Sequence, residues 1–427
     1  MGSIAQRWQS FVRVCFGCAR KLHPRAASSS GKLLDTGCHG AGILRGTCVA
    51  ALVGDEELVK QETDLFVVGG GPAGLAVGIA AAQRGLSVTV ADVARPPIDK
   101  ACGEGIMPDG LLALRAIGVD LTGLAASPFE GIRFVDAAGE THARFPRGGG
   151  LGMRRAALHS ILVAKAESAG VCLAWGTGVE AVRQGEVVAD GTTIKSQYIV
   201  CADGQNSSLR QTVGLDTGKL YRLRYGFRTH YQMKPWSPFV EVHWADCGQI
   251  YVTPVGAEEL CVVFITSDQH IRLDDALPMF PELRERLAGQ TISDRAMGGI
   301  TATRKLKAVT HGRIALVGDS SGSADAITGD GLSLAFQQAT ALADAMCSGD
   351  LNEYQRKHDK ISRLPRTMGE LMLVMHDYPW VRKKMFRGFS QSPQMFEKLL
   401  AMHTRTISPL QLGVKDCISF GWSVLRA

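Results

Sequence analysis

The loop at residues 69–74, Gly-Gly-Gly-Pro-Ala-Gly, constrains the possible folds of this chain more than any other feature of the sequence. Residues 65–68 precede it as a short apolar run, which is typical of a buried parallel strand. Residues 75–84 are expected to form a helix, and residues 86–91 a second apolar strand that closes with Asp92. The pattern therefore predicts one βαβ unit with a glycine-rich loop at its first turn.

Three glycines of this loop each have a physical reason for their position. Gly69 permits the tight turn, Gly71 lets the backbone approach a pyrophosphate, and Gly74 allows the helix to pack closely on the strand. The helix N-terminus then presents its amide groups to the phosphates, and Asp92 is placed to accept hydrogen bonds from the adenosine ribose. The residues expected to hold a dinucleotide here are Gly69, Gly71, Pro72, Ala73, Gly74 and Asp92.

Two further motifs follow later in the chain. Residues 201–210 begin after a predicted strand and contain an Asp-Gly turn, and residues 318–319 form a Gly-Asp pair after another predicted strand. A loop at residues 326–331 then opens a helix predicted over 331–347. Such turns, taken singly, are usually no more than turns, but their order along this chain points to a cofactor site. The residues expected to contact the cofactor are Asp203, Gly204, Gly318, Asp319, Gly329 and Gly331.

In this order the three motifs resemble the FAD-dependent aromatic-hydroxylase superfamily, over residues 63–345. That superfamily includes single-component monooxygenases, geranylgeranyl reductases and flavin halogenases. The resemblance implies FAD as the cofactor, with Asp203 and Gly204 near its pyrophosphate. It also implies that Asp319 binds the ribityl chain and that Arg155 contacts the cofactor.

The glycines of the loop at 328–331 also have a physical interpretation. A loop without side chains can lie against the isoalloxazine edge, and a helix that starts at Gly331 aims its positive end at N1 and the C2 carbonyl. Reduced flavin carries its negative charge there, so the helix dipole favours reduction. The sequence therefore predicts a site for redox chemistry.

We expect an α/β fold, in which a Rossmann-type FAD-binding domain similar to that of glutathione reductase is intergrown with a mainly antiparallel β substrate domain. The FAD-binding domain is predicted to be discontinuous, over residues 62–215 and 300–350. Residues 216–299 are expected to form the substrate domain, and residues 351–427 a helical C-terminal region.

Residues 1–61 differ from the rest of the chain and are expected to be a poorly ordered basic extension. The first 34 residues contain arginine and lysine but no acidic residue, which resembles an organellar transit peptide and equally a mis-assigned start. Cys15 and Cys18 form a CxxC, with Cys38, His39 and Cys48 downstream, but this is a weak zinc pattern, and no metal is predicted.

The motifs leave the reaction open between three interpretations. A single dinucleotide fingerprint means that the nicotinamide either visits transiently or is replaced by another electron donor, and transient NAD(P)H is the expected donor. A monooxygenase would hydroxylate or epoxidise an apolar or phenolic small molecule through a C4a-hydroperoxide of the reduced flavin, and this is the favoured interpretation. Residues 100–108, Lys-Ala-Cys-Gly-Glu-Gly-Ile-Met-Pro, resemble the Cys-Gly loop of geranylgeranyl reductases and suggest a double-bond reductase instead. The third alternative is an electron-carrying or non-catalytic flavoprotein.

Several side chains are candidates for positions around the flavin. Cys102 and Glu104 are expected to lie close to it. A dry pocket is needed in either enzyme, and four residues of the predicted antiparallel sheet could line it, although packing or surface positions are the commoner role for such residues. No general base is evident, so no catalytic residue is assigned. The four sheet residues are His230, His243, Trp244 and Tyr251.

Composition limits the partners and the location of the protein. The net charge of +6 is modest, and no basic run is interleaved with aromatic residues, so nucleic acid is not expected as a partner. The most apolar window, residues 65–82, is interrupted by the glycine loop, which predicts a cytoplasmic protein rather than a spanning one. Residues 380–387 mix aromatic residues with cations, so peripheral membrane contact stays open, as does organellar targeting by residues 1–61.

Overall fold

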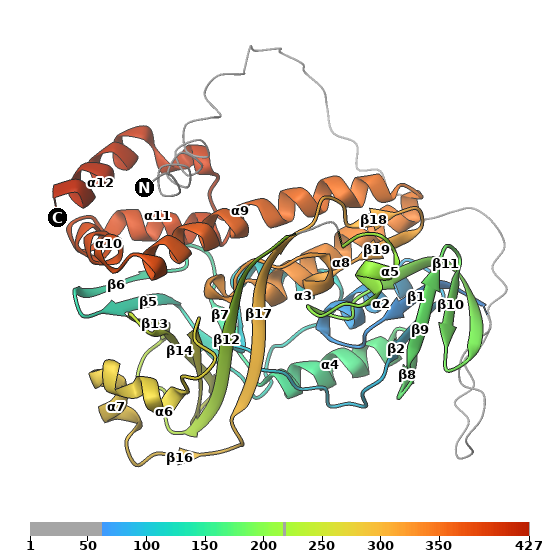
Figure 1. Cartoon of the computed structure of the whole chain (residues 1–427), viewed down its shortest axis with the longest axis horizontal. Helices are drawn as coiled ribbons and strands as arrows, with labels where there is room; N and C mark the ends of the chain where they lie inside the picture. Colours follow the sequence, from blue (N-terminus) through green and yellow to red (C-terminus); the bar gives the residue numbers. More distant parts are fainter. Residues whose placement is uncertain (1–61, 217–218, 427) are drawn as a thin grey trace, which may run out of the picture.

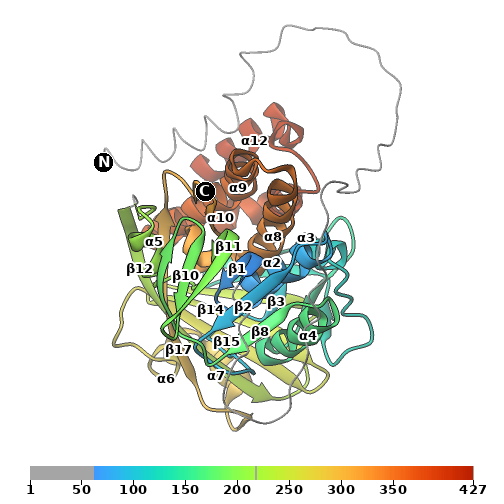
Figure 2. The same ribbon diagram turned by 90° about the vertical axis from the view of Figure 1, so that its right-hand side faces the viewer.

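The computed structural model describes residues 62–216 and 219–426. The predicted basic extension, with its transit-peptide-like composition and the pair Cys15 and Cys18, lies outside the described residues. Two large sheets lie side by side, and the C-terminal helices run along one end of both (Figure 1). The view turned by 90° shows these helices gathered at that end (Figure 2).

The first sheet is the Rossmann-type core that the glycine loop predicted. β1 (Glu62–Val68) lies between two parallel neighbours, β2 (Val88–Asp92) and β11 (Thr192–Cys201). β8 continues the parallel order beyond β2, and β19 continues it beyond β11. The remaining strands of this sheet are β8 (Cys172–Trp175), β9 (Val179–Arg183), β10 (Glu186–Ala189), β18 (Thr310–His311) and β19 (Ile314–Leu316).

The helix after the glycine loop is almost completely buried. α2 (Pro72–Ala82) packs between β1, α4 (Arg155–Ser168) and α8 (Gly331–Ser348), which explains why nearly all of its side chains are apolar. A proline in its first turn costs no hydrogen bond. Gly78 allows the close approach to the sheet, because a Cβ there would lie 3.0 Å from Cγ2 of Val90.

The second sheet is antiparallel except where β13 pairs with β5 in parallel. Its strands do not all come from residues 216–299, since β5 and β6 precede that segment and β17 runs past its end. The two sheets are thus intergrown, as predicted, while the domain boundaries themselves stay a prediction. The strands are β5 (Gly131–Asp136), β6 (Gly139–Arg144), β12 (Lys219–Gln232), β13 (Phe239–Ala245), β14 (Gly248–Gly256), β15 (Glu259–Thr266), β16 (Thr291–Ile292) and β17 (Met297–Lys305).

Short elements connect the two sheets. A small three-stranded sheet brings the loop around Glu104 against the second sheet, and α3 follows that loop directly. These connecting elements are β3 (Gly105–Ile106), β4 (Ser127–Phe129), β7 (Gly150–Gly152), α3 (Pro108–Ala116) and α5 (Leu209–Thr212). α6 (Leu273–Ala276) and α7 (Pro281–Leu287) lie between β15 and β16 of the second sheet.

The C-terminal helices build a second hydrophobic core on the second sheet. Phe134 of β5 contacts the ring of Phe396 at 5.1 Å between centroids and that of Trp244 at 5.6 Å. Arg382 is buried and donates to Asp136 at 2.7 Å, so this cation of the segment 380–387 faces inward. Within the described residues, no helix is both long and apolar enough to cross a membrane. The helices are α9 (Leu351–Asp377), α10 (Pro379–Gln391), α11 (Pro393–His403) and α12 (Val414–Arg426).

A proline interrupts the hydrogen bonding of α9. Pro365 has no N–H, so the carbonyl of Ile361, four residues earlier, loses its partner within the helix. Nη2 of Arg405 donates to this carbonyl at 2.7 Å. Arg405 lies just beyond α11, with a φ of +57°, so α11 and α9 are joined at the point where α9 is interrupted.

Candidate functional site

A single continuous cavity of about 580 Å³ lies where the two sheets and the C-terminal helices meet. Pockets of this size are typical of sites for small molecules and cofactors. All three sequence motifs reach its wall, together with Arg155 and the predicted flavin-proximal residues Cys102 and Glu104. The predicted residues that line it are Gly69, Gly71, Pro72, Ala73, Asp92, Cys102, Glu104, Arg155, Asp203, Gly204, Gly318, Asp319, Gly329 and Gly331.

The glycine loop has the geometry expected of a phosphate-binding turn. Gly69 has a φ of +111°, and a Cβ there would lie 2.4 Å from the carbonyl oxygen of Ala202. A Cβ at Gly71 would meet nothing within 4 Å, so this position opens onto the cavity. Gly74 does not line the cavity; a Cβ there would lie 1.8 Å from the carbonyl oxygen of Gly69, so this glycine serves packing.

The acidic residue after β2 is held beside the loop. Oδ2 of Asp92 accepts from the backbone N–H of Gly70 at 2.7 Å, and Oδ1 accepts from that of Ala94 at 2.8 Å. His159 was not predicted from the sequence; it is buried, with Nε2 2.9 Å from the carbonyl of Gly70. Each Asp92 oxygen keeps a free lone pair for a ligand, since a carboxylate oxygen accepts two hydrogen bonds.

Unpartnered polar atoms in the cavity wall fit a dinucleotide. Among the described residues, Nε of Arg155 and Oδ1 of Asp203 are buried without a hydrogen-bond partner, although such atoms are rarely left unpaired. Burial raises the pKa of Asp203. A Cβ at Gly331 would meet nothing within 4 Å, so the N-terminal end of α8 opens onto the same space. A ligand with phosphates and hydroxyl groups would supply these missing partners, as FAD would.

The Gly-Asp pair after β19 also faces the cavity. Gly318 has a φ of +63°, and its N–H donates to Oε1 of Gln338 on α8 at 2.8 Å. The carboxylate of Asp319 lies 3.6 Å from Nζ of Lys100, and both side chains are nearly half exposed. This carboxylate is therefore available to ligand hydroxyl groups.

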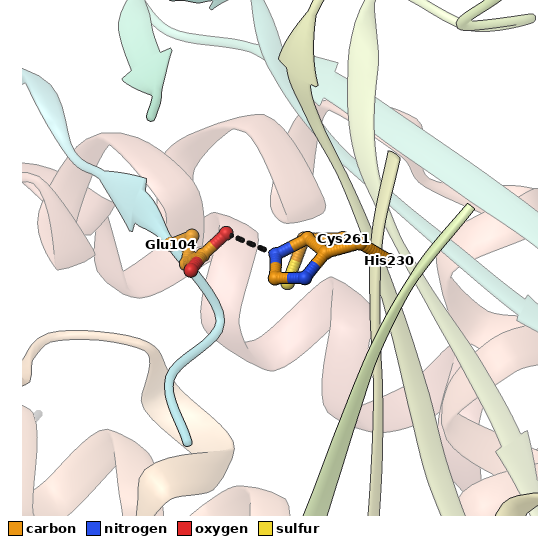
Figure 3. Close-up of side chains that lie close together, drawn as sticks. All are labelled: Glu104, His230 and Cys261. Atoms are coloured by element: carbon orange, nitrogen blue, oxygen red, sulfur yellow. Dashed lines mark hydrogen bonds and ion pairs between the residues drawn. The ribbon is translucent and has the colours of Figure 1, made fainter. Parts of the chain in front are cut away.

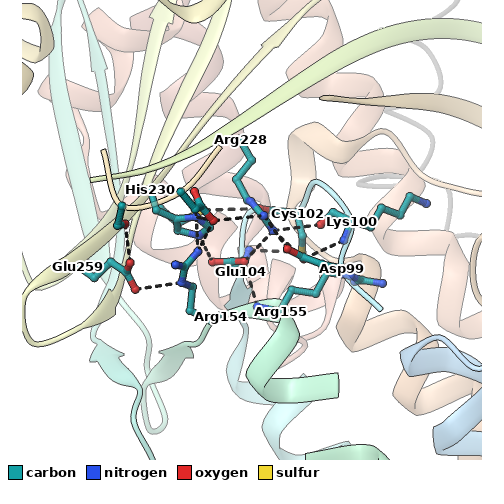
Figure 4. A network of polar contacts seen from close by, with 12 residues as sticks. Asp99, Lys100, Cys102, Glu104, Arg154, Arg155, Arg228, His230 and Glu259 are labelled. Carbon is teal, nitrogen blue, oxygen red and sulfur yellow. Dashed lines mark hydrogen bonds and ion pairs between the residues drawn. The ribbon is translucent and has the colours of Figure 1, made fainter. Parts of the chain in front are cut away.

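Glu104 lies at the centre of a buried polar network (Figure 4). Its φ is +57°, which a non-glycine residue rarely adopts. Oε1 accepts from the backbone N–H of Arg155 at 3.0 Å and from Nη1 of Arg228 at 3.1 Å, and Oε2 lies 2.7 Å from Nε2 of His230. Arg228 also donates to both oxygens of Asp99 at 2.8 Å. The network fixes the loop before β3 to strand β12 of the second sheet.

Glu104, His230 and Cys261 also have potential ligand atoms within 4.8 Å of one another (Figure 3). Glu104 and His230 already bind each other, and the guanidinium of Arg228 next to them would repel a cation. Burial raises the pKa of the Cys261 thiol, so the thiolate that a metal would need is disfavoured. The cluster is best described as an ion-pair network.

Of the four sheet residues considered for the pocket, only Tyr251 lines the cavity. Its hydroxyl donates to the carbonyl of Ile327 at 2.7 Å, and burial raises its pKa. His230 belongs to the network around Glu104, and Nε2 of His243 lies 2.9 Å from Glu241. Trp244 packs against Phe134. The commoner packing role therefore applies to these three residues.

A protein-family model described as an FAD binding domain matches residues 62–349 of the chain. The chain belongs to this FAD-binding family. It is an FAD-dependent oxidoreductase of the aromatic-hydroxylase superfamily, as the order of its three motifs predicted.

Relatives of this flavoprotein act in quinone and quinolone chemistry, by their names. The chain is 26% identical to the menaquinone reductase of Mycobacterium tuberculosis over 324 residues, which cover 69% of this chain and 78% of that protein. It is 27% identical to the 2-heptyl-3-hydroxy-4(1H)-quinolone synthase of Mycobacteroides abscessus over 329 residues, covering 70% and 86%. A solved flavoprotein/dehydrogenase from Cytophaga hutchinsonii has a TM-score of 0.72 at 15% identity, covering 85% of this chain and 98% of that one, and so shares the fold.

Away from the motifs, the cavity of the flavoprotein is mainly apolar, with Ser362, Arg366 and His403 as polar residues of the helices. One wall is the second sheet, and the other is formed by α9, α10 and α11. Sequence reasoning did not identify these helix residues, although the spacing of Met368, Met372 and Met375 places them on one face of a helix. The apolar lining consists of Phe134, Val240, Val242, Val263, Ile265, Met368, Leu371, Met372, Met375, Phe389, Phe396, Leu399 and Leu400.

Proposed function

We propose that this flavoprotein is a monooxygenase whose substrate joins an aromatic or quinone-type ring to a long apolar chain. The observation that carries the proposal is the continuity of one cavity from the FAD motifs to the apolar space under α9–α11. In this proposal the ring lies beside the flavin and the chain extends between the second sheet and the helices. The names of the two curated relatives denote rings of this kind that bear apolar chains, which supports the choice.

We further propose that the motif residues hold FAD in the way their sequence positions predict. The glycine loop and the N-terminus of α2 receive the pyrophosphate, Asp92 the adenosine ribose, and Asp319 the ribityl chain. FAD would give hydrogen-bond partners to Nε of Arg155 and Oδ1 of Asp203, which have none among the described residues. Bound FAD supplies electrons, taken from a transient NAD(P)H, to oxygen or directly to the substrate.

The protein's own part in the reaction is to exclude water and to position the ring. The apolar walls keep water away from the reacting atoms. The hydroxyl of Tyr251 is committed to the carbonyl of Ile327, so it fixes the loop before α8 rather than acting as an acid. The N-terminal end of α8 favours negative charge at the flavin edge that faces it.

A double-bond reductase is the second candidate, and the loop at 102–105 favours it. Cys102 and Glu104 line the cavity, and their segment resembles the corresponding loop of geranylgeranyl reductases. An electron carrier without a substrate would not need the apolar extension. Peripheral membrane contact stays a prediction, for which the exposed Trp380 and Trp422, both 57% exposed, offer apolar surface.

The experiment offers purified holoprotein two probes, a 2-heptyl-4-quinolone and a menaquinone, with NADH or NADPH. A monooxygenase consumes oxygen faster when the quinolone is present and yields a product that has gained one oxygen atom. A reductase yields, without oxygen, a menaquinone that has gained two hydrogen atoms. If the FAD is reducible but neither product forms, the proposed substrate class is contradicted.

A variant in the apolar end tests where the chain lies. Met372→Trp shortens the space under α9, so the preferred chain length should fall, and the KM for the heptyl probe should rise at least about tenfold. Met279→Trp is the matched control, because Met279 is 47% exposed and lies outside the cavity lining. Equal KM values in both variants would place the chain elsewhere.

A further inference from the structure

Asp330 and His403 form a buried pair in the cavity wall. Asp330 belongs to the loop at 326–331, whereas His403 lies in none of the sequence motifs. Asp330 precedes the first residue of α8, and its side chain makes no capping hydrogen bond to that helix. Its Oδ1 instead lies 3.2 Å from Nε2 of His403, the last residue of α11. The two side chains are 5% and 10% exposed, and both residues line the cavity.

Each partner keeps one buried polar atom without a hydrogen-bond partner among the described residues. These atoms are Oδ2 of Asp330 and Nδ1 of His403. Buried polar atoms are rarely left unpaired, and those that are often belong to functional sites. The pair therefore holds unsatisfied polar atoms at the end of α8 that opens onto the cavity.

Two carboxylates act on the imidazole of His403, and a guanidinium lies next to one of them. Asp330 lies at the start of α8, Asp109 belongs to α3, and Arg405 follows α11 with Nη1 3.6 Å from Asp109. Burial lowers the pKa of His403, but Asp330, Asp109 and the backbone of Thr328 raise it more, so the net pKa is raised. Burial and the charge of Asp330 together raise the pKa of Asp109. Both titrations depend on the charge inside this cluster.

We infer that Asp330 and His403 couple reduction of the bound flavin to the uptake of one proton. The inference rests on the proposed placement of the flavin against the N-terminal end of α8. Hydride transfer from NAD(P)H adds two electrons and one proton to the flavin, which leaves one additional negative charge at the edge facing α8. That charge raises the pKa of the nearby imidazole, so a proton from solvent binds His403. The proton returns to solvent when the electrons leave.

Asp330 sets the pH range in which this coupling operates, because its carboxylate raises the pKa of His403. Its buried carboxylate disfavours a second negative charge nearby unless His403 is protonated. Flavin reduction is therefore less favourable when His403 is neutral. Because reduction and protonation are thermodynamically linked, protonation of His403 is likewise more favourable when the flavin is reduced. The C-terminal helices thereby supply an acid–base group to a cofactor that the first sheet binds.

The test is the midpoint potential of the holoprotein as a function of pH, measured without substrate or oxygen. Wild type should show a pH window in which the potential falls about twice as steeply as in His403→Gln, because two protons accompany two electrons instead of one. His403→Gln should also lower the potential near neutral pH, because Asp330 is then uncompensated. Asp330→Asn/His403→Gln should restore the potential towards wild type, but not the steep window.

His376→Gln is the control for loss of a buried histidine, because His376 lies outside the cavity lining and bonds to Gln249. Its potential should follow that of wild type at every pH. Equal slopes in wild type and His403→Gln would overturn the inference. So would loss of FAD from both His403→Gln and Asp330→Asn, since the pair would then serve binding. Neither result bears on whether the substrate is oxygenated or reduced, so the proposed function is tested separately.

Discussion

At Gly71, one added methyl group should affect cofactor binding without affecting the folding of the apoprotein. The apoprotein has room for a Cβ there, while the expected pyrophosphate occupies the same space. Gly71→Ala should therefore leave the melting temperature of the apoprotein unchanged and weaken FAD binding by about 1.4–2.8 kcal/mol, roughly tenfold to a hundredfold. Fluorescence titration of apoprotein with FAD measures this.

Gly421→Ala is the matched control for that titration. A Cβ at Gly421 also meets nothing within 4 Å, but this residue lies on α12, outside the cavity lining. Unchanged FAD affinity in Gly71→Ala would show that the phosphates bind elsewhere.

Glu241 makes the stability of the second sheet depend on acid pH. Its buried carboxylate accepts from Nη1 of Arg133 at 2.8 Å and from Nε1 of Trp236 at 3.1 Å, and lies 2.9 Å from Nε2 of His243. Burial raises its pKa, but His243, Trp236 and Arg133 lower it more, to about 2. A lowered pKa means that its contribution is present above the ordinary value of 4.5 and is lost as the pH falls towards 2.

Urea unfolding between pH 5 and pH 2.5 should therefore show a loss of stability on the order of 3 kcal/mol in wild type. Glu241→Gln should start less stable and show a shallower pH dependence over this range. Parallel pH profiles for the two proteins would assign the acid sensitivity to other groups.

Single residues were predictable from the sequence where backbone geometry dictates their type. Gly69 and Gly318 have positive φ angles and could be found by the motifs that require them. Asp330 lay inside a motif segment, yet its partner His403 follows 73 positions later in a helix with no motif. Only the packing of α11 on the start of α8 brings the two together, and periodicity cannot predict that.

At the scale of elements, the contribution of Arg405 to stability depends on the presence of Pro365 in α9. Arg405→Met removes the partner of the Ile361 carbonyl and should cost about 1 kcal/mol. In a Pro365→Ala background the helix supplies its own N–H to that carbonyl, so the same change should cost clearly less. Thermal unfolding of the four proteins gives the coupling energy.

Arg363→Met is the control, because Arg363 is exposed on the same helix. A coupling energy of zero would mean that the Ile361 carbonyl is satisfied in some other way.

The elements themselves were largely predictable, because their hydrophobic periods are clear. The expected helices at 75–84 and 331–347 appear as α2 and α8, and the expected strands at 65–68 and 86–91 appear as β1 and β2. The assignment of strands to sheets was not predictable to the same degree. β5 and β6 form a hairpin whose alternating pattern fits either sheet, and only the parallel pairing of β5 with β13 places it in the second.

At the scale of the whole molecule, FAD should stabilise every part at once, because both sheets and the C-terminal helices wall the same cavity. We expect calorimetry to show one unfolding transition that moves upward with FAD, with a gain of about 2.7 kcal/mol at a hundredfold excess over Kd. Two transitions, of which FAD moves only one, would show that the sheets unfold independently.

The intergrowth of the two sheets also sets an order of events during synthesis. The second sheet needs β5 early in the chain and β17 near residue 305, and the first sheet needs β19 at Ile314–Leu316. Neither sheet can be completed on the ribosome until this late stretch has left the exit tunnel. Until then the earlier strands have unpaired edges and exposed apolar faces. Such a nascent chain is prone to aggregate, so we expect it to bind chaperones.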